Sequence, residues 1–274
     1  MSGADLPGPA ALVLLAAASA AAGAVNAVAG GGTILTFPVL AALLPDGPGR
    51  AVAANATSTI GLWPGTVAAA WVSRGARAAL PPWARWLVVP SVVGAAAGVA
   101  LVLWLPPRTF AAAVPWLILL AAVLFAAQPW LARLTPPPRS DVPPRPAPAG
   151  VLLACVAQLL VAVYGGYFGA GIGILMLAML GLAGLGDIHR LNGVKNVLAM
   201  LINGVATALF AVGSFLGDYA VAWPCVLVMA AGSVAGGFAG AAVARRLPAA
   251  AVRRGVAVLG FGLAAYYLWR HNLG

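Results

Sequence analysis

Apolar residues form ten long runs that are separated by short polar, basic or proline-rich segments. The first half of the chain has apolar runs near residues 8–28, 33–45, 51–72, 84–104 and 109–128. The second half has runs near residues 150–168, 172–185, 190–213, 219–244 and 250–269. A transmembrane helix needs about 20 apolar residues. The pattern therefore predicts an all-α integral membrane protein with eight to ten transmembrane segments.

A glycine-rich segment interrupts the apolar pattern at the same place in each half. The first is Gly30-Gly31-Gly32, preceded by Asn26 and followed by Thr33, and we call residues 30–32 the first break. The second reads Gly165-Gly166-Tyr-Phe-Gly169-Ala-Gly171-Ile-Gly173, and we call residues 165–173 the second break. Broken backbone at membrane depth is tolerated where it lines a cavity. Paired interruptions in two halves are typical of a transporter's binding site.

The two halves match element by element, which predicts an internal duplication. Arg50 follows Gly31 by nineteen residues, and Arg190 follows Gly171 by nineteen. We divide the chain into a first membrane repeat (1–128), a proline-rich linker that cannot be helical (129–149) and a second membrane repeat (150–274). The runs 33–45 and 172–185 are too short to span comfortably. Each is expected to form a hairpin with the preceding run, with the break at or near its tip.

Other glycines favour a different interpretation. Gly94 and Gly98 are spaced by four on an uninterrupted run, and so are Gly232, Gly236 and Gly240 in the matching run of the second half. This spacing is typical of helices that pack closely in a membrane, because small residues let backbones approach each other. We therefore expect these five glycines to pack helices and the two breaks to bind a ligand.

The arginine positions predict that the two repeats are inverted relative to each other. The loop between the third and fourth runs carries Arg74, Arg77 and Arg85 in the first half, whereas its counterpart carries only Asp218. The next loop reverses this, with Arg108 alone in the first half and arginines at 245, 246, 253 and 254 in the second. Corresponding loops then lie on opposite sides of the membrane. The linker is expected to be cytoplasmic and both termini extracytoplasmic, although Arg270 argues against that placement.

Composition excludes several classes of protein. Hydrophobic residues make up 63% of the 274 residues and charged residues only 7%, against about 25% charged residues in a soluble domain. The net charge is +10, but short-loop arginines orient a membrane protein and contact lipid headgroups. No basic patch alternates with aromatic residues as in single-strand binders. We expect contact with membrane lipid and no binding of nucleic acid.

The N-terminal run resembles a signal peptide, but we expect it to be a retained helix. No Lys or Arg precedes Arg50, so the basic start of a signal peptide is missing. The run also has a counterpart in the second half.

No catalytic or cofactor-binding pattern is present in the sequence, and we expect no enzyme, no cofactor and no metal site. The chain contains no Glu, and Cys155 and Cys225 lie in apolar runs, where free thiols behave as small hydrophobes. Asp187 and His189 are close enough in sequence to form a small metal or proton site. The alternative is a pair of solvated loop residues, and that alternative is favoured.

Polar residues on two matching runs predict a polar lining beside the breaks. The third run begins with Asn55-Ala-Thr57-Ser58-Thr59, and its counterpart carries Lys195-Asn196, followed by Asn203 and Thr207. Two interpretations of Lys195, the only lysine, stay open: it snorkels to the interface, or it faces the cavity and attracts an anion. Glycine amides and a new helix N-terminus also favour an anion. The predicted binding residues are Asn26, Gly30, Gly31, Gly32, Thr33, Thr57, Ser58, Gly169, Gly171, Gly173, Lys195 and Asn196.

Four motifs occur in order along nearly the whole chain. They are Gly30-Gly31-Gly32-Thr33 followed by Pro38, Ala54-Asn55-Ala56-Thr57-Ser58, Arg190-Leu-Asn192-Gly-Val-Lys195-Asn196, and Gly236-Gly-Phe-Ala-Gly240 through Arg245-Arg-Leu-Pro248. Their order and spacing resemble the TauE/SafE family of membrane permeases, the proposed sulfite exporters. The resemblance implies export of a small sulfur-containing anion, such as sulfite or an organosulfonate. One departure is Gly169-Ala-Gly-Ile-Gly, where the family commonly has a tighter glycine run.

These observations predict a multi-pass secondary transporter of the cell membrane whose substrate is a small anion. Two helical hairpins meet near the bilayer midplane, and rocking of one repeat against the other exposes the site to each side in turn. An anion channel is the nearest alternative, and a non-transporting membrane subunit is another. Homo-oligomerisation stays open. No membrane carboxylate is present to carry protons, so facilitated diffusion is the simpler mechanism.

Overall fold

The computed structural model describes residues 7–28, 30–74, 81–133, 148–185, 188–217, 219–243 and 249–272. All regular secondary structure in these ranges is helical, as the sequence predicted. The helices are α1 (Pro9–Val28), α2 (Thr33–Leu43), α3 (Arg50–Arg74), the short 3₁₀ helix η1 (Pro82–Leu87), α4 (Val88–Trp104), α5 (Pro107–Arg133), α6 (Pro148–Tyr167), α7 (Ile172–Leu182), α8 (Ile188–Leu216), α9 (Trp223–Val243) and α10 (Ala249–Asn272). Each predicted apolar run corresponds to one α-helix.

The helix ends around the linker differ from the prediction. α5 continues to Arg133 through Pro129, and α6 begins at Pro148. The helix accommodates Pro129 near its end, although a proline in a helix interior removes a backbone hydrogen bond. Pro148 stands at the first helical position, where a missing N–H group has no consequence. The prediction that the whole stretch 129–149 is non-helical is therefore wrong at both ends, and its middle lies outside the described residues.

Six helical segments in the described ranges are long and apolar enough to cross a membrane: 9–27, 82–104, 107–131, 148–167, 190–216 and 223–240. The protein is therefore a multi-pass membrane protein. α2 and α7 have 11 residues each, and at 1.5 Å per residue neither reaches across a hydrocarbon core of about 30 Å. Their predicted shortness is confirmed. α3 has arginine at both ends, and α10 contains Arg253 and Arg254, so spanning by these two helices stays a prediction.

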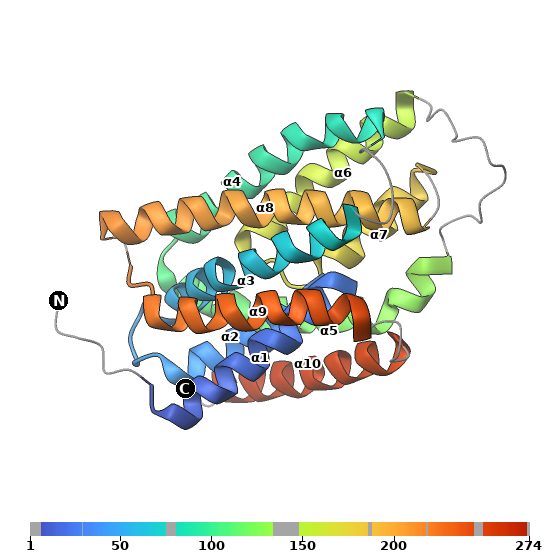
Figure 1. The fold of residues 1–274 in the computed structure, drawn as a ribbon. Coiled ribbons are helices and arrows are strands. Elements are labelled where there is room, and N and C mark those ends of the chain that lie inside the picture. Colours follow the sequence, from blue (N-terminus) through green and yellow to red (C-terminus); the bar gives the residue numbers. More distant parts are fainter. Residues whose placement is uncertain are drawn as a thin grey trace.

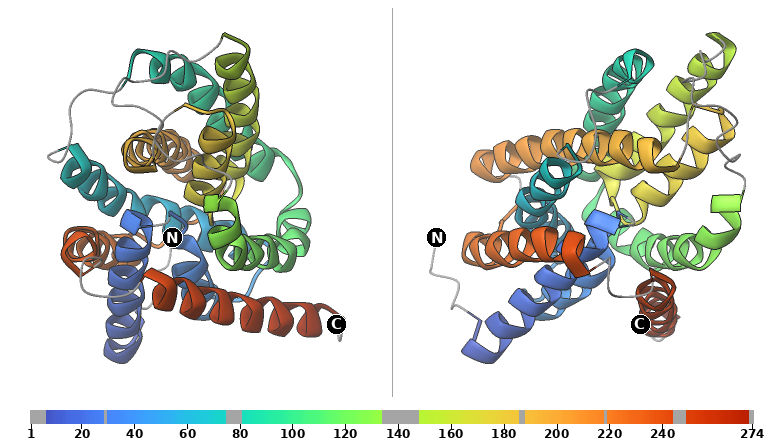
Figure 2. Two further views of the ribbon diagram at one scale, coloured as in Figure 1. Left: turned by 90° about the vertical axis from the view of Figure 1, so that its right-hand side faces the viewer. Right: turned by 45° about the vertical axis from the view of Figure 1, so that its right-hand side comes forward.

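The helices are arranged in a bundle with α3 and α8 near its middle (Figure 1). α4 and α6 lie together along one edge, and α10 lies along the opposite edge against α5, as both turned views also show (Figure 2). α1 packs mainly against α9, and α6 packs mainly against α4. The first helix of each half thus packs against the helix of the fourth apolar run in the other half. A two-fold relation between repeats requires such an exchange, although the duplication itself stays a prediction.

Glycines bring the two exchanged pairs of helices into backbone contact. A Cβ added to Gly94 would lie 2.7 Å from Ala162 Cβ, and one added to Gly98 would overlap the Val163 carbonyl oxygen. In the α1–α9 pair, a Cβ on Gly240 would lie 2.6 Å from Ala24 Cα, and one on Gly236 would overlap the Ala20 carbonyl oxygen. Real Cβ contacts are not this short. The prediction that these glycines pack helices closely is confirmed.

An aromatic cluster fixes the end of α6 against α2 and α5. Phe168, which follows α6, packs edge-on against Phe37 of α2 with ring centroids 5.5 Å apart. Phe110 of α5 packs against Tyr167 at 5.3 Å and against Phe168 at 6.5 Å. Edge-to-face pairs of this kind contribute roughly 0.5–1.5 kcal/mol beyond the area they bury. The cluster thus holds the second break beside α2.

Adding one methyl group at the α4–α6 contact is expected to destabilise the protein. Gly98→Ala should lower the free energy of unfolding in detergent by about 1–3 kcal/mol, because the contact is already backbone to backbone. Gly262→Ala on α10 is the matched control, since a Cβ there meets nothing within 4 Å, and a helical Gly→Ala change is usually neutral or stabilising. Equal stability of the two variants would contradict close packing at Gly98.

Candidate functional site

The two breaks touch each other through their backbones. A Cβ on Gly30 would lie 2.8 Å from Gly173 Cα, and one on Gly31 would overlap the backbone nitrogen of Gly171. Gly30 and Gly31 have φ values of +71° and +119°, and Gly169 and Gly171 have +82° and +79°. Only glycine adopts such φ values without strain. Conformation and proximity therefore both require glycine where the two halves of the chain meet.

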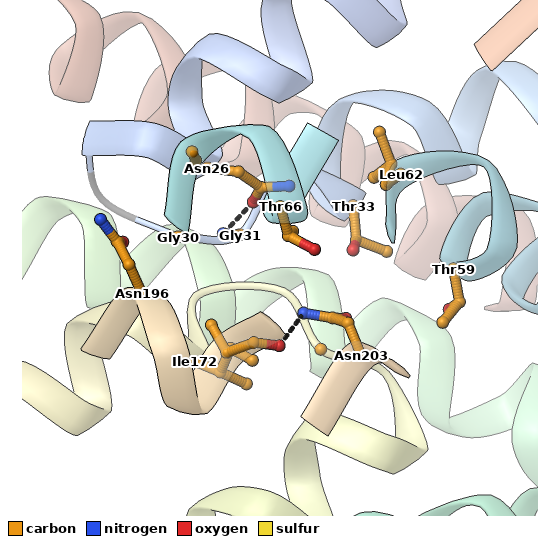
Figure 3. Close-up of a pocket in the computed structure, with 13 residues that line it drawn as sticks. Asn26, Gly30, Gly31, Thr33, Thr59, Leu62, Thr66, Ile172, Asn196 and Asn203 are labelled. Carbon is orange, nitrogen blue, oxygen red and sulfur yellow. Dashed lines mark hydrogen bonds between the residues drawn. The ribbon is translucent and has the colours of Figure 1, made fainter. Parts of the chain in front are cut away.

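The first break is closed by a side chain of the preceding helix. Asn26 Oδ1 accepts hydrogen bonds from the backbone N–H groups of Gly31 and Gly32, each at 2.7 Å, and Figure 3 shows the bond to Gly31. Gly30 N donates to the carbonyl oxygen of Val25 at 3.1 Å. The sequence-based expectation of free amides is therefore wrong for Gly30, Gly31 and Gly32, because the chain supplies their acceptors.

At the second break, a side chain of the preceding helix donates a hydrogen bond instead of accepting one. The Tyr164 hydroxyl donates to the Ala170 carbonyl oxygen at 2.6 Å, and Gly169 N donates to the Tyr164 carbonyl oxygen at 3.1 Å. Within the described part of the chain, the backbone N–H groups of residues 170–173 make no hydrogen bond. These amides open α7, where the helix dipole favours negative charge. Free amides, as expected from the sequence, are thus found at the second break only.

A small cavity lies beside the contact between the breaks (Figure 3). Its volume is about 20 Å³, close to the space that one water molecule needs. It is lined by residues from both halves of the chain: Asn26, Gly30, Gly31, Thr33, Thr59, Leu62, Thr66, Ala69, Gly169, Ile172, Asn196, Ala199 and Asn203. Six of the twelve predicted binding residues are in this set, namely Asn26, Gly30, Gly31, Thr33, Gly169 and Asn196.

The other predicted residues lie elsewhere. Gly32, Gly171 and Gly173 belong to the breaks but do not line the cavity. The hydroxyls of Thr57 and Ser58 are engaged in hydrogen bonds to other segments of the chain. The Thr57 hydroxyl accepts a hydrogen bond from Ala222 N at 3.2 Å, and the Ser58 hydroxyl bonds Thr36 of α2 at 2.7 Å. Both side chains are fully buried. Their interpretation as substrate ligands is therefore not supported by their contacts.

Lys195 matches neither of its two predicted positions. Its side chain is 0% exposed, so it does not snorkel to an interface, and it does not line the cavity. Among the described residues, Nζ has no hydrogen-bond partner. The neighbouring Asn196, which is 4% exposed, does line the cavity. Of these two neighbouring residues, only Asn196 lines the cavity.

Helical periodicity could have found the lining residues that the sequence analysis missed. Thr59, Leu62, Thr66 and Ala69 follow each other at intervals of three or four residues along α3. Asn196, Ala199 and Asn203 do the same along α8. Residues at these intervals share one face of a helix. Counting on in steps of three or four residues from Thr59 and from Asn196 would have predicted the lining residues Leu62, Thr66, Ala69 and Ala199. No such spacing identifies Ile172.

The cavity offers neutral hydrogen-bonding groups. The side chains of Thr33 and Thr59 are each 8% exposed, and within the described part of the chain their hydroxyls have no hydrogen-bond partner. The Asn203 amide nitrogen donates to the Ala199 carbonyl oxygen at 2.8 Å, which turns its oxygen away from that bond. No group of three or more His, Cys, Asp or Glu residues gathers in the described ranges. The candidate pair of Asp187 and the His189 side chain lies outside the described residues.

Removing the acceptor that closes the first break is expected to destabilise the protein. Asn26→Ala leaves the amides of Gly31 and Gly32 without a partner, and each buried unsatisfied amide costs about 1–3 kcal/mol. Thermal unfolding in detergent should show a clear drop in Tm. Asn192→Ala is the matched control, because Asn192 is part-buried on α8 and does not line the cavity. An unchanged Tm for Asn26→Ala would mean that the first break does not depend on this side chain.

Comparison with known proteins identifies the family. No curated protein sequence and no solved structure matches the chain. The family model described as sulfite exporter TauE/SafE matches residues 15–267. The match includes both breaks and every residue that lines the cavity. The chain therefore belongs to the sulfite exporter TauE/SafE family.

Proposed function

We propose that this chain is a secondary transporter that exports a small sulfur-containing anion, such as sulfite or an organosulfonate, across the cell membrane. The observation that carries the proposal is the contact between the two breaks, with a cavity of hydrogen-bond donors beside it. Amides at a helix N-terminus and free hydroxyls suit the oxygens of an anion. Membership of an exporter family supports the substrate class and the direction of transport.

The size of the cavity supports a carrier that changes conformation. A sulfur atom with three oxygens needs more space than the one water that about 20 Å³ accommodates. Both halves contribute to the lining, with most of the side chains supplied by α3 in the first half and α8 in the second. We therefore propose that the structure is a closed state and that movement of one half against the other opens it. The exchanged packing of α1 with α9 and of α6 with α4 supports inverted repeats.

Transport in this account involves no covalent step. The anion binds, the halves move, and the anion leaves on the other side unchanged. The groups that the cavity supplies are suited to binding and not to nucleophilic or acid–base chemistry, since the lining consists of Gly, Ala, Leu, Ile, Thr and Asn. In a channel, the anion would pass without the protein closing around it. Single-channel currents in a planar bilayer would reveal such conduction.

Flux into proteoliposomes tests the proposal, and Thr33→Val identifies the site. Wild-type protein should take up radiolabelled sulfite with saturation, and empty liposomes should not. Thr33→Val keeps the shape of the side chain but removes a free donor, so KM should rise about ten- to a hundredfold, as expected for one hydrogen bond to a charged group. Thr109→Val is the control, because Thr109 is exposed at the start of α5.

Two outcomes would contradict the proposal. Absence of saturable sulfite uptake in folded protein would remove sulfite as the substrate. Equal KM values for Thr33→Val and Thr109→Val would place the binding site away from the cavity.

A further inference from the structure

Resting on the proposed function, we infer that the anion crosses in its singly charged, protonated form, hydrogen sulfite, and that the site rejects the sulfite dianion. The substrate then carries its own proton. This assignment depends on the charge of the cavity lining, on the donors in it and on one free acceptor.

The lining carries no ionisable side chain. Among the described residues, the titratable groups on elements around the cavity are Arg50 on α3, Cys155, Tyr164 and Tyr167 on α6, and Arg190 and Lys195 on α8, and none of them lines it. Tyr164 donates its hydroxyl to the Ala170 carbonyl oxygen. Arg50 pairs with Asp46 outside the helix. Lys195 is fully buried one helical turn before the lining residue Ala199, and it is not among the residues that line the cavity.

A neutral lining discriminates by charge. The cost of moving an ion from water into a site of low dielectric constant grows with the square of its charge, and a partner charge in the site is needed to offset it. Two negative charges on sulfite therefore meet a much larger cost than the single charge of hydrogen sulfite. Hydroxyls and amides can stabilise one charge through hydrogen bonds. Without a cation in the lining, nothing compensates a second charge.

The donors in the cavity are ready to receive the charged oxygens of a monoanion. Thr33 and Thr59 each present a hydroxyl that is without a partner in the described ranges, on side chains more than nine-tenths buried. Asn26 has its oxygen committed to the first break, which leaves its amide nitrogen as a donor. Figure 3 shows this nitrogen turned toward the side where Thr33 and Thr66 lie. The second break adds amides without acceptors at the start of α7.

One acceptor in the cavity fits the proton of the substrate. Asn203 Oδ1 lies 4.0 Å from the position of a Cβ on Gly169, and Thr33 Oγ1 lies 3.9 Å from the same position. Since the Asn203 nitrogen donates to the Ala199 carbonyl oxygen, the orientation of the amide is fixed and its oxygen is free. Hydrogen sulfite in its O–H form donates to this oxygen. The sulfite dianion has no hydrogen-bond donor, and its negative charge is repelled by the partial negative charge of the Asn203 oxygen.

The proton balance follows directly. Hydrogen sulfite enters the cavity with its proton, crosses, and dissociates into sulfite and a proton on the side of higher pH, so no bond of the protein changes. This removes the need for a carboxylate in the membrane. Asp46, the aspartate within the described ranges, lies between α2 and α3 and not on a helix. Transport is then linked to pH although no titratable residue lines the pathway at the cavity.

The pH dependence of sulfite flux tests the inference. Initial rates of uptake into proteoliposomes should be measured below saturation, from weakly acidic to weakly alkaline pH, with empty liposomes subtracted to remove sulfur dioxide leakage. We expect the rate to follow the hydrogen sulfite fraction and to fall about tenfold for each pH unit above its pKa. A pH dye inside the vesicles should report acidification with uptake. A rate that stays constant or rises with pH would overturn the inference.

Competition and one variant test the charge and the acceptor separately. Methanesulfonate, a monoanion without an O–H group, should compete with a constant that does not change with pH, and sulfate should not compete. Asn203→Ala should raise KM for hydrogen sulfite several-fold and change the methanesulfonate constant less than twofold. Asn192→Ala is the matched control, because Asn192 is part-buried on the same helix and does not line the cavity. Stronger competition by sulfate than by methanesulfonate would overturn the inference, as would equal effects of Asn203→Ala on both anions.

Failure of the inference and failure of the proposed function are distinguishable. Saturable sulfite uptake that follows the dianion would leave the transporter in place and refute the protonated substrate. Absence of sulfite uptake at every pH in folded protein would refute both.

Discussion

The rest of the structure depends on a backbone contact between the two breaks. The Gly31 position lies against the nitrogen of Gly171, and the Gly30 position lies against Gly173. A contact this short leaves no space for a Cβ, so glycine is required by proximity as well as by positive φ. The contact brings α2 and α7, which are too short to cross the membrane, end to end inside the bundle. The cavity lies beside this contact and is lined by residues of both breaks.

Both breaks contain buried backbone groups that need hydrogen-bond partners, and the two breaks obtain these partners in different ways. Asn26 accepts from the amides of the first break, whereas Tyr164 donates to a carbonyl of the second. A buried polar group without a partner is costly, so each break needs such a side chain from the helix before it. The consequence is asymmetric. The first break has its amides occupied, and the second leaves amides free at the start of α7. A substrate anion therefore finds its backbone donors on one side of the cavity.

The sequence predicted much of the fold but only part of the site. Apolar periodicity placed every α-helix, and glycine spacing separated packing glycines such as Gly98 from the breaks. The partners of buried hydroxyls are a matter of tertiary packing, which is why Thr57 and Ser58 were expected at the site and lie instead in contacts with Ala222 and Thr36. The charge of Lys195 also did not identify a lining residue, because Lys195 is fully buried on α8 and the neutral Asn196, Ala199 and Asn203 line the cavity. The neutral face of α8 supplies the lining.

The meeting of the two breaks around a substrate site is tested most directly by cross-linking across the cavity. Thr33→Cys and Asn203→Cys should be combined in a chain whose own cysteines are replaced, since both side chains lie about 4 Å from the same point at Gly169. A short thiol cross-linker should join the pair within one chain, and sulfite should slow the reaction. Failure of folded protein to cross-link, or a rate that sulfite leaves unchanged while it is transported, would contradict the account.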